Sequence, residues 1–130
     1  MRPDLTKAQR RRIRELAGTA YERELSHELA ALEDQFGRWR RREIDAYELS
    51  DGIHGFHQGP NRRLFLMYTG SDLAMAVASA IVRGILTEEE ATSEMVGLLS
   101  ALIEYARQAN GAGTSENESE SGSAGGGPTD

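Results

Sequence analysis

Two of the three histidines, His54 and His57, stand three residues apart, and Asp51 precedes His54 by the same spacing. Side chains three apart on a helix share a face, so both imidazoles and the carboxylate can meet there. Imidazole and carboxylate groups are the usual ligands of zinc and other divalent ions. A divalent-metal site is therefore one interpretation of this segment.

A second spacing of this kind lies earlier in the chain, where Glu24 precedes His27 by three residues. In ferritin-like bundles, Glu-x-x-His pairs from two helices and two further glutamates bind a di-metal centre. The further glutamates are hard to find here, because the helix expected over 73–83 contains none. The candidate metal ligands are His54, His57, Asp51, Glu24 and His27.

Two other interpretations of the histidines stay open. In the structural one, His57 bonds a backbone carbonyl at the edge of the core and His54 lies at the surface. In the other, one of them acts in acid–base catalysis, but no nucleophile is paired with them by spacing, and Ser50 on the same face is a weak signal. The structural interpretation is favoured, and with it a non-enzymatic protein.

Arg62 and Arg63 suggest an anion site. Pro60 suits the first turn of a helix, because it has no N–H to donate. The two guanidinium groups would then lie beside free backbone N–H groups, an arrangement that binds phosphate-like anions. The sequence contains no glycine-rich phosphate loop.

The chain is predicted to be all-α, a compact bundle of about five helices with a long first helix. Three capping boxes begin helices at Thr6, Asp45 and Thr87, each followed three residues later by Gln or Glu. No segment alternates with period two for long enough to form a strand. The helices are expected from Thr6 to about 42, and then over 45–58, 60–68, 73–83 and 87–109.

The first helix carries an apolar stripe from Ile13 to Trp39. Thirty or more helical residues span about 45–55 Å, which overhangs a domain of this size. The overhang predicts a homo-oligomer through the first helix, with an unidentified protein as the other kind of partner.

Glycine residues and apolar runs predict the ends and the burial of the remaining helices. Gly59 is expected in the left-handed region as a helix C-terminus, and Gly84 likewise. Residues 64–68 are apolar on all sides and are expected to be well buried. Residues 73–82 are too few to cross a bilayer and predict a buried central helix. The turns at 42–48 and 84–90 share one plan, although the first lacks a glycine.

Composition divides the chain into one helical domain, residues 1–110, and a disordered acidic tail rich in glycine and serine, residues 111–130. The absence of cysteine excludes disulfides and thiolate metal sites. No membrane association is expected. Without an apolar segment typical of a secretory signal, the expected location is the cytoplasm.

A basic cluster near the N-terminus offers a further alternative, nucleic-acid binding. Its members are Arg10, Arg11, Arg12 and Arg14. The net charge of the protein is −6, and residues 1–63 hold thirteen of the fifteen basic residues beside eleven acidic ones. That balance argues against a general phosphate-backbone binder as the main function.

The sequence Ile53-His54-x-Phe56-His57-x-Gly59, followed by Arg63-Leu64 and Tyr68, resembles a motif of an uncharacterised group of small bacterial all-helical proteins. The resemblance covers residues 16–90. It implies a helical fold and no known activity. Those proteins carry acidic residues where this chain has Gly55 and Gln58, so the resemblance also implies that two potential carboxylate ligands are absent here.

Taken together, these patterns predict a small cytoplasmic interaction or regulatory protein that self-associates and is not an enzyme. The first alternative is a divalent-metal-binding protein centred on His54 and His57. The second alternative is nucleic-acid binding through residues 10–14.

Overall fold

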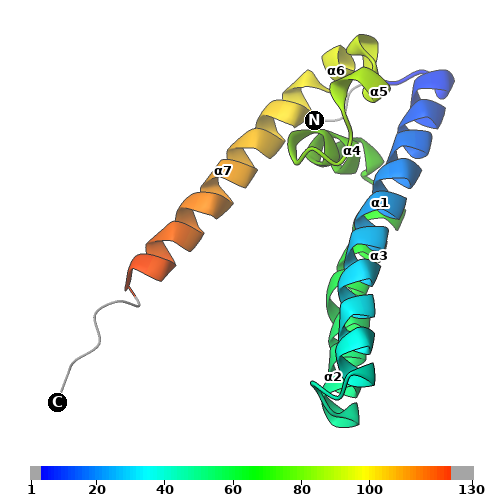
Figure 1. The fold of residues 1–130 in the computed structure, drawn as a ribbon. Coiled ribbons are helices and arrows are strands. Elements are labelled where there is room, and N and C mark those ends of the chain that lie inside the picture. The colour runs from blue at the N-terminus through cyan, green and yellow to red at the C-terminus, as the bar shows by residue number, and fades with distance from the viewer. Residues whose placement is uncertain (1–3, 124–130) are drawn as a thin grey trace.

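The computed structural model describes residues 4–123, and of residues 112–123 the backbone alone. The part of the chain that it describes contains helices and no strand, which confirms the all-α class and the long first helix (Figure 1). The elements are α1 (Lys7–Arg40), α2 (Ala46–Phe56), the π-helix η1 (His57–Asn61), α3 (Arg62–Thr69), α4 (Leu73–Val82), α5 (Glu88–Ala91), α6 (Ser93–Leu98) and α7 (Ser100–Ser123).

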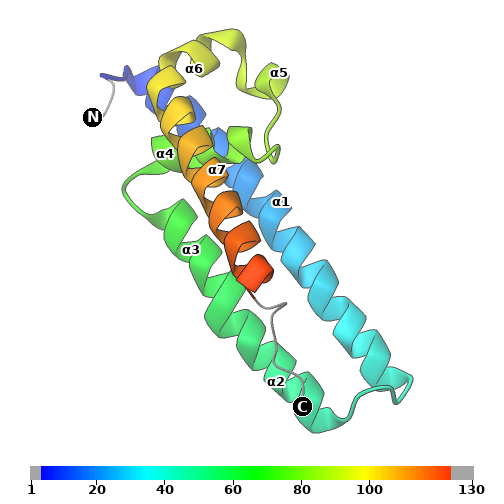
Figure 2. The same cartoon turned by 90° about the vertical axis from the view of Figure 1, so that its left-hand side faces the viewer.

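These helices form a long hairpin with a head at one end. α1 is one arm, and α2, η1 and α3 follow one another without a break as the antiparallel second arm (Figure 2). α4 crosses the upper end of the hairpin, and α5, α6 and the start of α7 complete the head (Figure 1). We call residues 22–63 the stem, because only the two arms of the hairpin contribute to it.

All three predicted capping boxes are present. The Gln9 N–H donates to Thr6 Oγ1 at 3.1 Å, and the Thr6 N–H donates to Gln9 Oε1 at 2.9 Å. The same reciprocal pairs begin the helices at 45–48 and 87–90. These caps satisfy N–H groups that the first turn of a helix leaves without partners, so local sequence fixes three helix starts.

The two turns that share a sequence plan also share a conformation. Arg42 has φ 61° and Gly84 has φ 78°, both left-handed. In each turn the next residue closes the helix end: the Glu43 N–H donates to the Arg38 carbonyl at 2.8 Å, and the Ile85 N–H donates to the Ala80 carbonyl at 2.9 Å. Both are Schellman endings, and the first uses arginine where glycine is the usual residue.

The predicted helix break at Gly59 is wrong, because the chain continues helically through η1 with Pro60 inside it. In an uninterrupted α-helix, Leu64 and Tyr68 would lie about 60° and 100° around the axis from Leu49. The extra residue in a π turn rotates the next part of the helix by about 100°. Leu64 and Tyr68 therefore return to the side that faces α1, and both are buried.

The core lies in the head, around α4. Ala76, Val77, Ala78 and Ala80 are each at most 4% exposed, which confirms 73–82 as the central helix. The first turns of α1 pack against it, as do the later helices of the head. The larger members of the core include Ile13, Leu16, Leu64, Tyr68, Val77, Leu86, Met95, Leu99 and Ile103.

Two expectations about the later chain need correction. The helix predicted over 87–109 is divided, because Thr92 has φ 80° between α5 and α6 and a further break follows Leu98. α7 then continues past the predicted stop at Asn110 to Ser123. Residues 124–130 lie outside the described part of the chain, and the disorder of 111–130 stays a prediction.

Candidate functional site

The structure does not bring the candidate metal ligands together. His27, Asp51, His54 and His57 are exposed, and the nearest polar atom recorded for His57 is the Asn61 side-chain nitrogen, 3.5 Å from its Nδ1. Glu24 is engaged elsewhere. Among the side chains that the structure describes, residues 4–111, no group of three or more His, Asp or Glu is placed to hold a metal ion.

The predicted anion site loses its backbone donors. Because η1 leads directly into α3, the Arg62 N–H donates to the Gly59 carbonyl within the helix. Arg63 lies 3.7 Å from Glu28 on α1 and is partly neutralised by it. Arg62 and Arg63 therefore have no free helix N-terminus beside them.

A polar cluster that the sequence did not reveal joins the stem to the head. Glu24 on α1 forms an ion pair with Arg83 and accepts a hydrogen bond from the Tyr68 hydroxyl. Arg83 Nη2 lies 3.2 Å from Glu24 Oε2 and 3.4 Å from the Tyr68 oxygen. The Tyr68 ring stacks on Tyr21, with centroids 5.4 Å apart. Three helices thus meet at one carboxylate.

The environment of this cluster shifts its acid–base properties. Burial raises the pKa of Glu24, but the hydrogen bonds from Arg83 and Tyr68 outweigh burial, and its pKa is lowered from 4.5. Burial and the hydrogen bond to Glu24 raise the pKa of Tyr68 to about 12. Glu24 is therefore an anion and Tyr68 a neutral donor at neutral pH, which suits a structural tie.

One sequence signal could have identified Glu24. By helical angle it lies about 40° from Ala20, on the face that α1 buries. A carboxylate on an apolar face requires a cationic or hydrogen-bonding partner. The sequence gives no means of choosing Arg83 and Tyr68, which are far away along the chain.

A second tie holds α1 to the turn before α5. Arg23 donates to Glu90 at 2.6 Å and 2.9 Å and to the Ile85 carbonyl at 2.8 Å. The hydrogen bond from Arg23, together with the cap at Thr87, lowers the pKa of Glu90 to about 2. Arg12 Nη2 also donates to the Glu90 carbonyl at 2.7 Å. Glu90 therefore caps α5 and also binds α5 to α1 through Arg23.

Half of the N-terminal basic cluster is paired within the protein. Arg11 and Arg12 lie 3.5 Å and 3.3 Å from the Glu15 carboxylate. Arg10 and Arg14 have no carboxylate partner among the described residues. The cluster is thus not a uniform basic surface.

The stem is held by few apolar contacts. In residues 22–63, Leu49 is the single buried side chain. Gly52 lets α2 approach α1 closely, since a Cβ there would lie 1.8 Å from Gln35 Oε1. At Gly55, one turn further, nothing lies within 4 Å of that position. The polar side chain of Gln35 therefore lies at the contact between α1 and α2, where apolar side chains are more usual.

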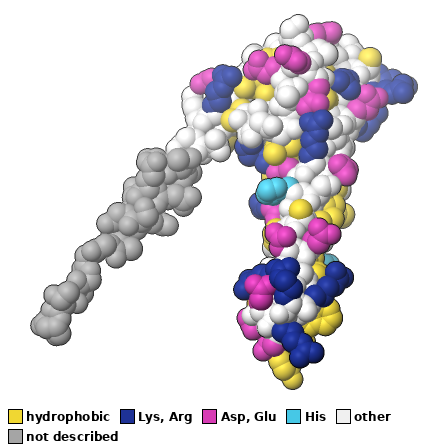
Figure 3. Space-filling model, in the orientation of Figure 1, with side chains coloured by type: hydrophobic (Ala, Val, Ile, Leu, Met, Phe, Trp, Pro, Cys, Tyr) yellow, Lys and Arg dark blue, Asp and Glu magenta, His cyan; other side chains and the backbone are white. Residues whose placement is uncertain are grey.

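Large apolar side chains are exposed along both arms of the hairpin. The predicted burial of residues 64–68 is wrong for two of them, Phe65 and Leu66. These two residues and four large apolar residues of the stem each have between 40% and 83% of their surface exposed. Figure 3 shows apolar side chains along the right-hand edge of the hairpin, between charged ones. The stem surface, as we call this set, consists of Leu29, Trp39, Tyr47, Ile53, Phe65 and Leu66.

Comparison with known proteins adds no relationship. No family model, no curated protein and no solved structure matches the chain. The resemblance to the small bacterial helical proteins therefore stays a prediction. Within the described residues, no helix is both long and apolar enough to span a membrane.

Proposed function

We propose that this protein is a non-enzymatic cytoplasmic interaction or regulatory protein that self-associates through the stem surface. The observation that carries the proposal is the exposure of six large apolar side chains on a hairpin whose stem, residues 22–63, buries only Leu49. A helix with an apolar stripe is stable when that stripe is covered by another element. A second hairpin supplies such an element.

The size of the stem surface is compatible with a dimer. A large side chain contributes about 150–250 Å² when fully accessible, so six side chains that are about half exposed offer several hundred Å² per protomer. Two protomers together reach the roughly 1,000 Å² of a specific interface. Scattered single apolar residues need no explanation, but two on each of three helices in one hairpin do.

Two antiparallel hairpins can form a four-helix bundle, with each helix packed about 20° from its neighbours. A two-fold axis would place the same residues of both copies in the interface. Charged residues flank the apolar ones on the stem (Figure 3), and such residues set the register of paired helices. This arrangement covers the stem surface without a change in either protomer.

The test is light scattering of the full chain over a range of concentrations, with the fluorescence of Trp39 recorded in parallel. Trp39 is the single tryptophan of the protein and belongs to the stem surface, so its emission reports directly on association. We expect a dimer at micromolar concentration, with blue-shifted emission. A strict monomer at high micromolar concentration would refute the proposal.

A matched pair of variants locates the interface. Leu29→Glu places a charge on the stem surface and should raise the dimer dissociation constant at least tenfold. Tyr105→Glu adds the same charge at an exposed aromatic residue on α7, outside the hairpin, and should leave dimerisation unchanged. Equal loss from both variants would show that association depends on net charge and not on the stem surface.

A further inference from the structure

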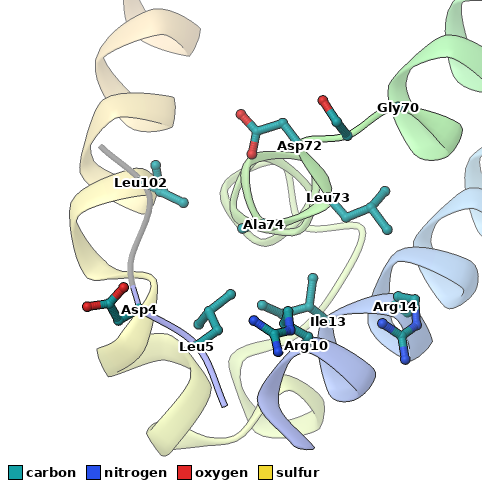
Figure 4. A pocket seen from close by; sticks show the side chains of 11 residues that line it. Asp4, Leu5, Arg10, Ile13, Arg14, Gly70, Asp72, Leu73, Ala74 and Leu102 are labelled. Carbon is teal, nitrogen blue, oxygen red and sulfur yellow. The ribbon is translucent and has the colours of Figure 1, made fainter. Parts of the chain in front are cut away.

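One cavity of the protein lies in the head, away from the stem. Its volume is about 780 Å³, and it lies between the start of α1, the loop before α4, α4 itself and α7 (Figure 4). Ligand sites typically have volumes of about 300–1,000 Å³. The apolar part of its lining consists of Leu5, Ile13, Leu73, Ala74 and Leu102.

Two arginines line this cavity, and they are the two members of the basic cluster that lack a partner. Arg10 and Arg14 both belong to the lining, four residues apart on α1. Neither forms an ion pair or a hydrogen bond through its side chain with the described side chains and backbone of residues 4–111. Like charges at this spacing destabilise a helix, and cations in its first turns are unfavourable to the helix dipole. An anion bound beside them would reduce both costs.

The acidic residues of the lining form no ion pair with these arginines among the described residues. Asp72 caps α4 and accepts the Met75 N–H at 3.3 Å. Asp4 also belongs to the lining, but no ion pair joins it to either arginine. Both guanidinium groups thus remain available for a carboxylate or phosphate, which they bind with paired N–H donors.

We propose that this cavity binds a small amphipathic anion. Its carboxylate or phosphate head pairs with Arg10 and Arg14, and its apolar part packs against Leu5, Ile13 and Leu73. The combination of apolar side chains with a few convergent polar groups is typical of small-molecule sites. The site is separate from the stem surface, so ligand binding and self-association can be tested independently.

The experiment is calorimetric titration of the full chain with octanoate and with octyl phosphate, which have alkyl chains of similar length and different head groups. Acetate, inorganic phosphate and octanol are the comparison probes, because each lacks either the apolar part or the charge. We expect binding of one ligand per chain for at least one of the two amphipathic anions. Each comparison probe should bind at least tenfold more weakly.

Two double variants assign the binding to the cavity. Arg10→Gln/Arg14→Gln should raise the dissociation constant of the amphipathic anion at least tenfold. Arg38→Gln/Arg62→Gln removes the same charge from two arginines elsewhere and should leave binding unchanged. Circular dichroism checks that both variants keep the helical fold.

Three results would overturn the proposal. The first is no binding of either amphipathic anion to the wild-type chain. The second is binding that octanol matches or that Arg10→Gln/Arg14→Gln does not weaken, which would indicate adsorption to apolar surface. The third is arginine-dependent binding of a short oligonucleotide without binding of the anions, which would assign Arg10 and Arg14 to nucleic acid.

Discussion

The head and the stem differ in how far their helices bury apolar side chains. The head surrounds α4 on several sides, and its alanines let neighbouring helices come close enough to exclude solvent. The stem has only two helices, so each arm has one covered side and a wide exposed one. A two-helix hairpin cannot bury both of its apolar stripes by itself. The long first helix is therefore stabilised by packing at its head end, whereas at its stem end much of its apolar surface stays exposed.

Polar ties compensate for this difference where the two regions meet. Glu24, Arg83 and Tyr68 join α1, α3 and the end of α4 at the upper end of the stem. Arg23 pairs with Glu90 and so joins the same turn of α1 to α5. The stem is thus anchored by charged groups at its upper end, and below them its helices are held mainly by Leu49 and by the close approach at Gly52.

The largest expected effect comes from truncating one leucine in each region. Leu99→Ala in the head should lower the free energy of unfolding by about 2–5 kcal/mol, because the side chain is fully buried and leaves a cavity. Leu29→Ala in the stem should change it by less than about 0.5 kcal/mol in the monomer, since that side chain is already exposed. Urea denaturation at a concentration below self-association measures both values. Equal losses would show that the stem is packed as tightly as the head.

A smaller effect is expected at the junction. Glu24→Gln should cost about 1–3 kcal/mol, because Arg83 loses a charged partner in a mostly buried site. Glu15→Gln on the same helix is the control, since its ion pairs are exposed and should contribute about 0–1 kcal/mol. Urea denaturation of both variants at pH 7 gives the comparison.

The same glutamate makes the junction sensitive to acid. Its pKa is lower in the folded protein than the ordinary 4.5, so the folded state binds fewer protons than the unfolded state in this range. Glu24 therefore stabilises the fold above about pH 4.5, and the contribution is lost as pH falls through its lowered pKa. Glu24→Gln should flatten the fall in unfolding free energy below pH 4.5. An unchanged pH profile would contradict the role assigned to this carboxylate.

The smallest effect compares the turn at the tip of the stem with its counterpart in the head. Arg42→Gly should raise the free energy of unfolding by about 0.5–1 kcal/mol, because glycine adopts the left-handed conformation without strain. Gly84→Ala should lower the free energy of unfolding by about 1–2 kcal/mol, because a residue with a Cβ is strained at a left-handed φ. A Cβ at this position meets no neighbour within 4 Å, so no steric clash adds to that cost. Thermal unfolding followed by circular dichroism resolves the two signs. A loss from Arg42→Gly would mean that the arginine side chain stabilises the tip.

The capping residues made the starts of the helices predictable from the sequence, whereas the connections between helices were less predictable. The caps at Thr6, Asp45 and Thr87 depend on residues three apart, and all three are present. Gly84 was identified by the same kind of local rule. Arg42 and Thr92 take positive φ without any residue that favours it, so the surrounding structure imposes these conformations.

The segment at 57–61 shows why local rules failed for the second arm. Glycine followed by proline usually separates two helices, because proline lacks an N–H and crowds the preceding turn. Here a π turn accommodates Pro60, and the contacts of Leu64 and Tyr68 with the core favour a continuous helix. Those contacts are made with distant residues, about which the positions adjacent to Pro60 carry no information.

The candidate site was predicted only in part. The apolar stripe of α1 was visible in the sequence and motivated the expectation of a partner, but the exposure of Phe65 and Leu66 was not. Their burial depends on how far the second arm is rotated about its axis. The spacing of the histidines predicted a metal site. Two histidines on one helix form such a site only if a neighbouring helix presents further ligands to them.

The order of the core along the chain has a consequence during synthesis. The hairpin is complete once Thr69 has left the ribosome, whereas the core that receives Ile13 and Leu16 also requires Leu99 and Ile103. At about 5–20 residues per second, the hairpin waits roughly 2–7 s for these residues. During that interval a nascent chain displays both its stem surface and the unfilled head end of α1. If the stem surface mediates self-association as proposed, neighbouring chains on one messenger can pair before either head has closed.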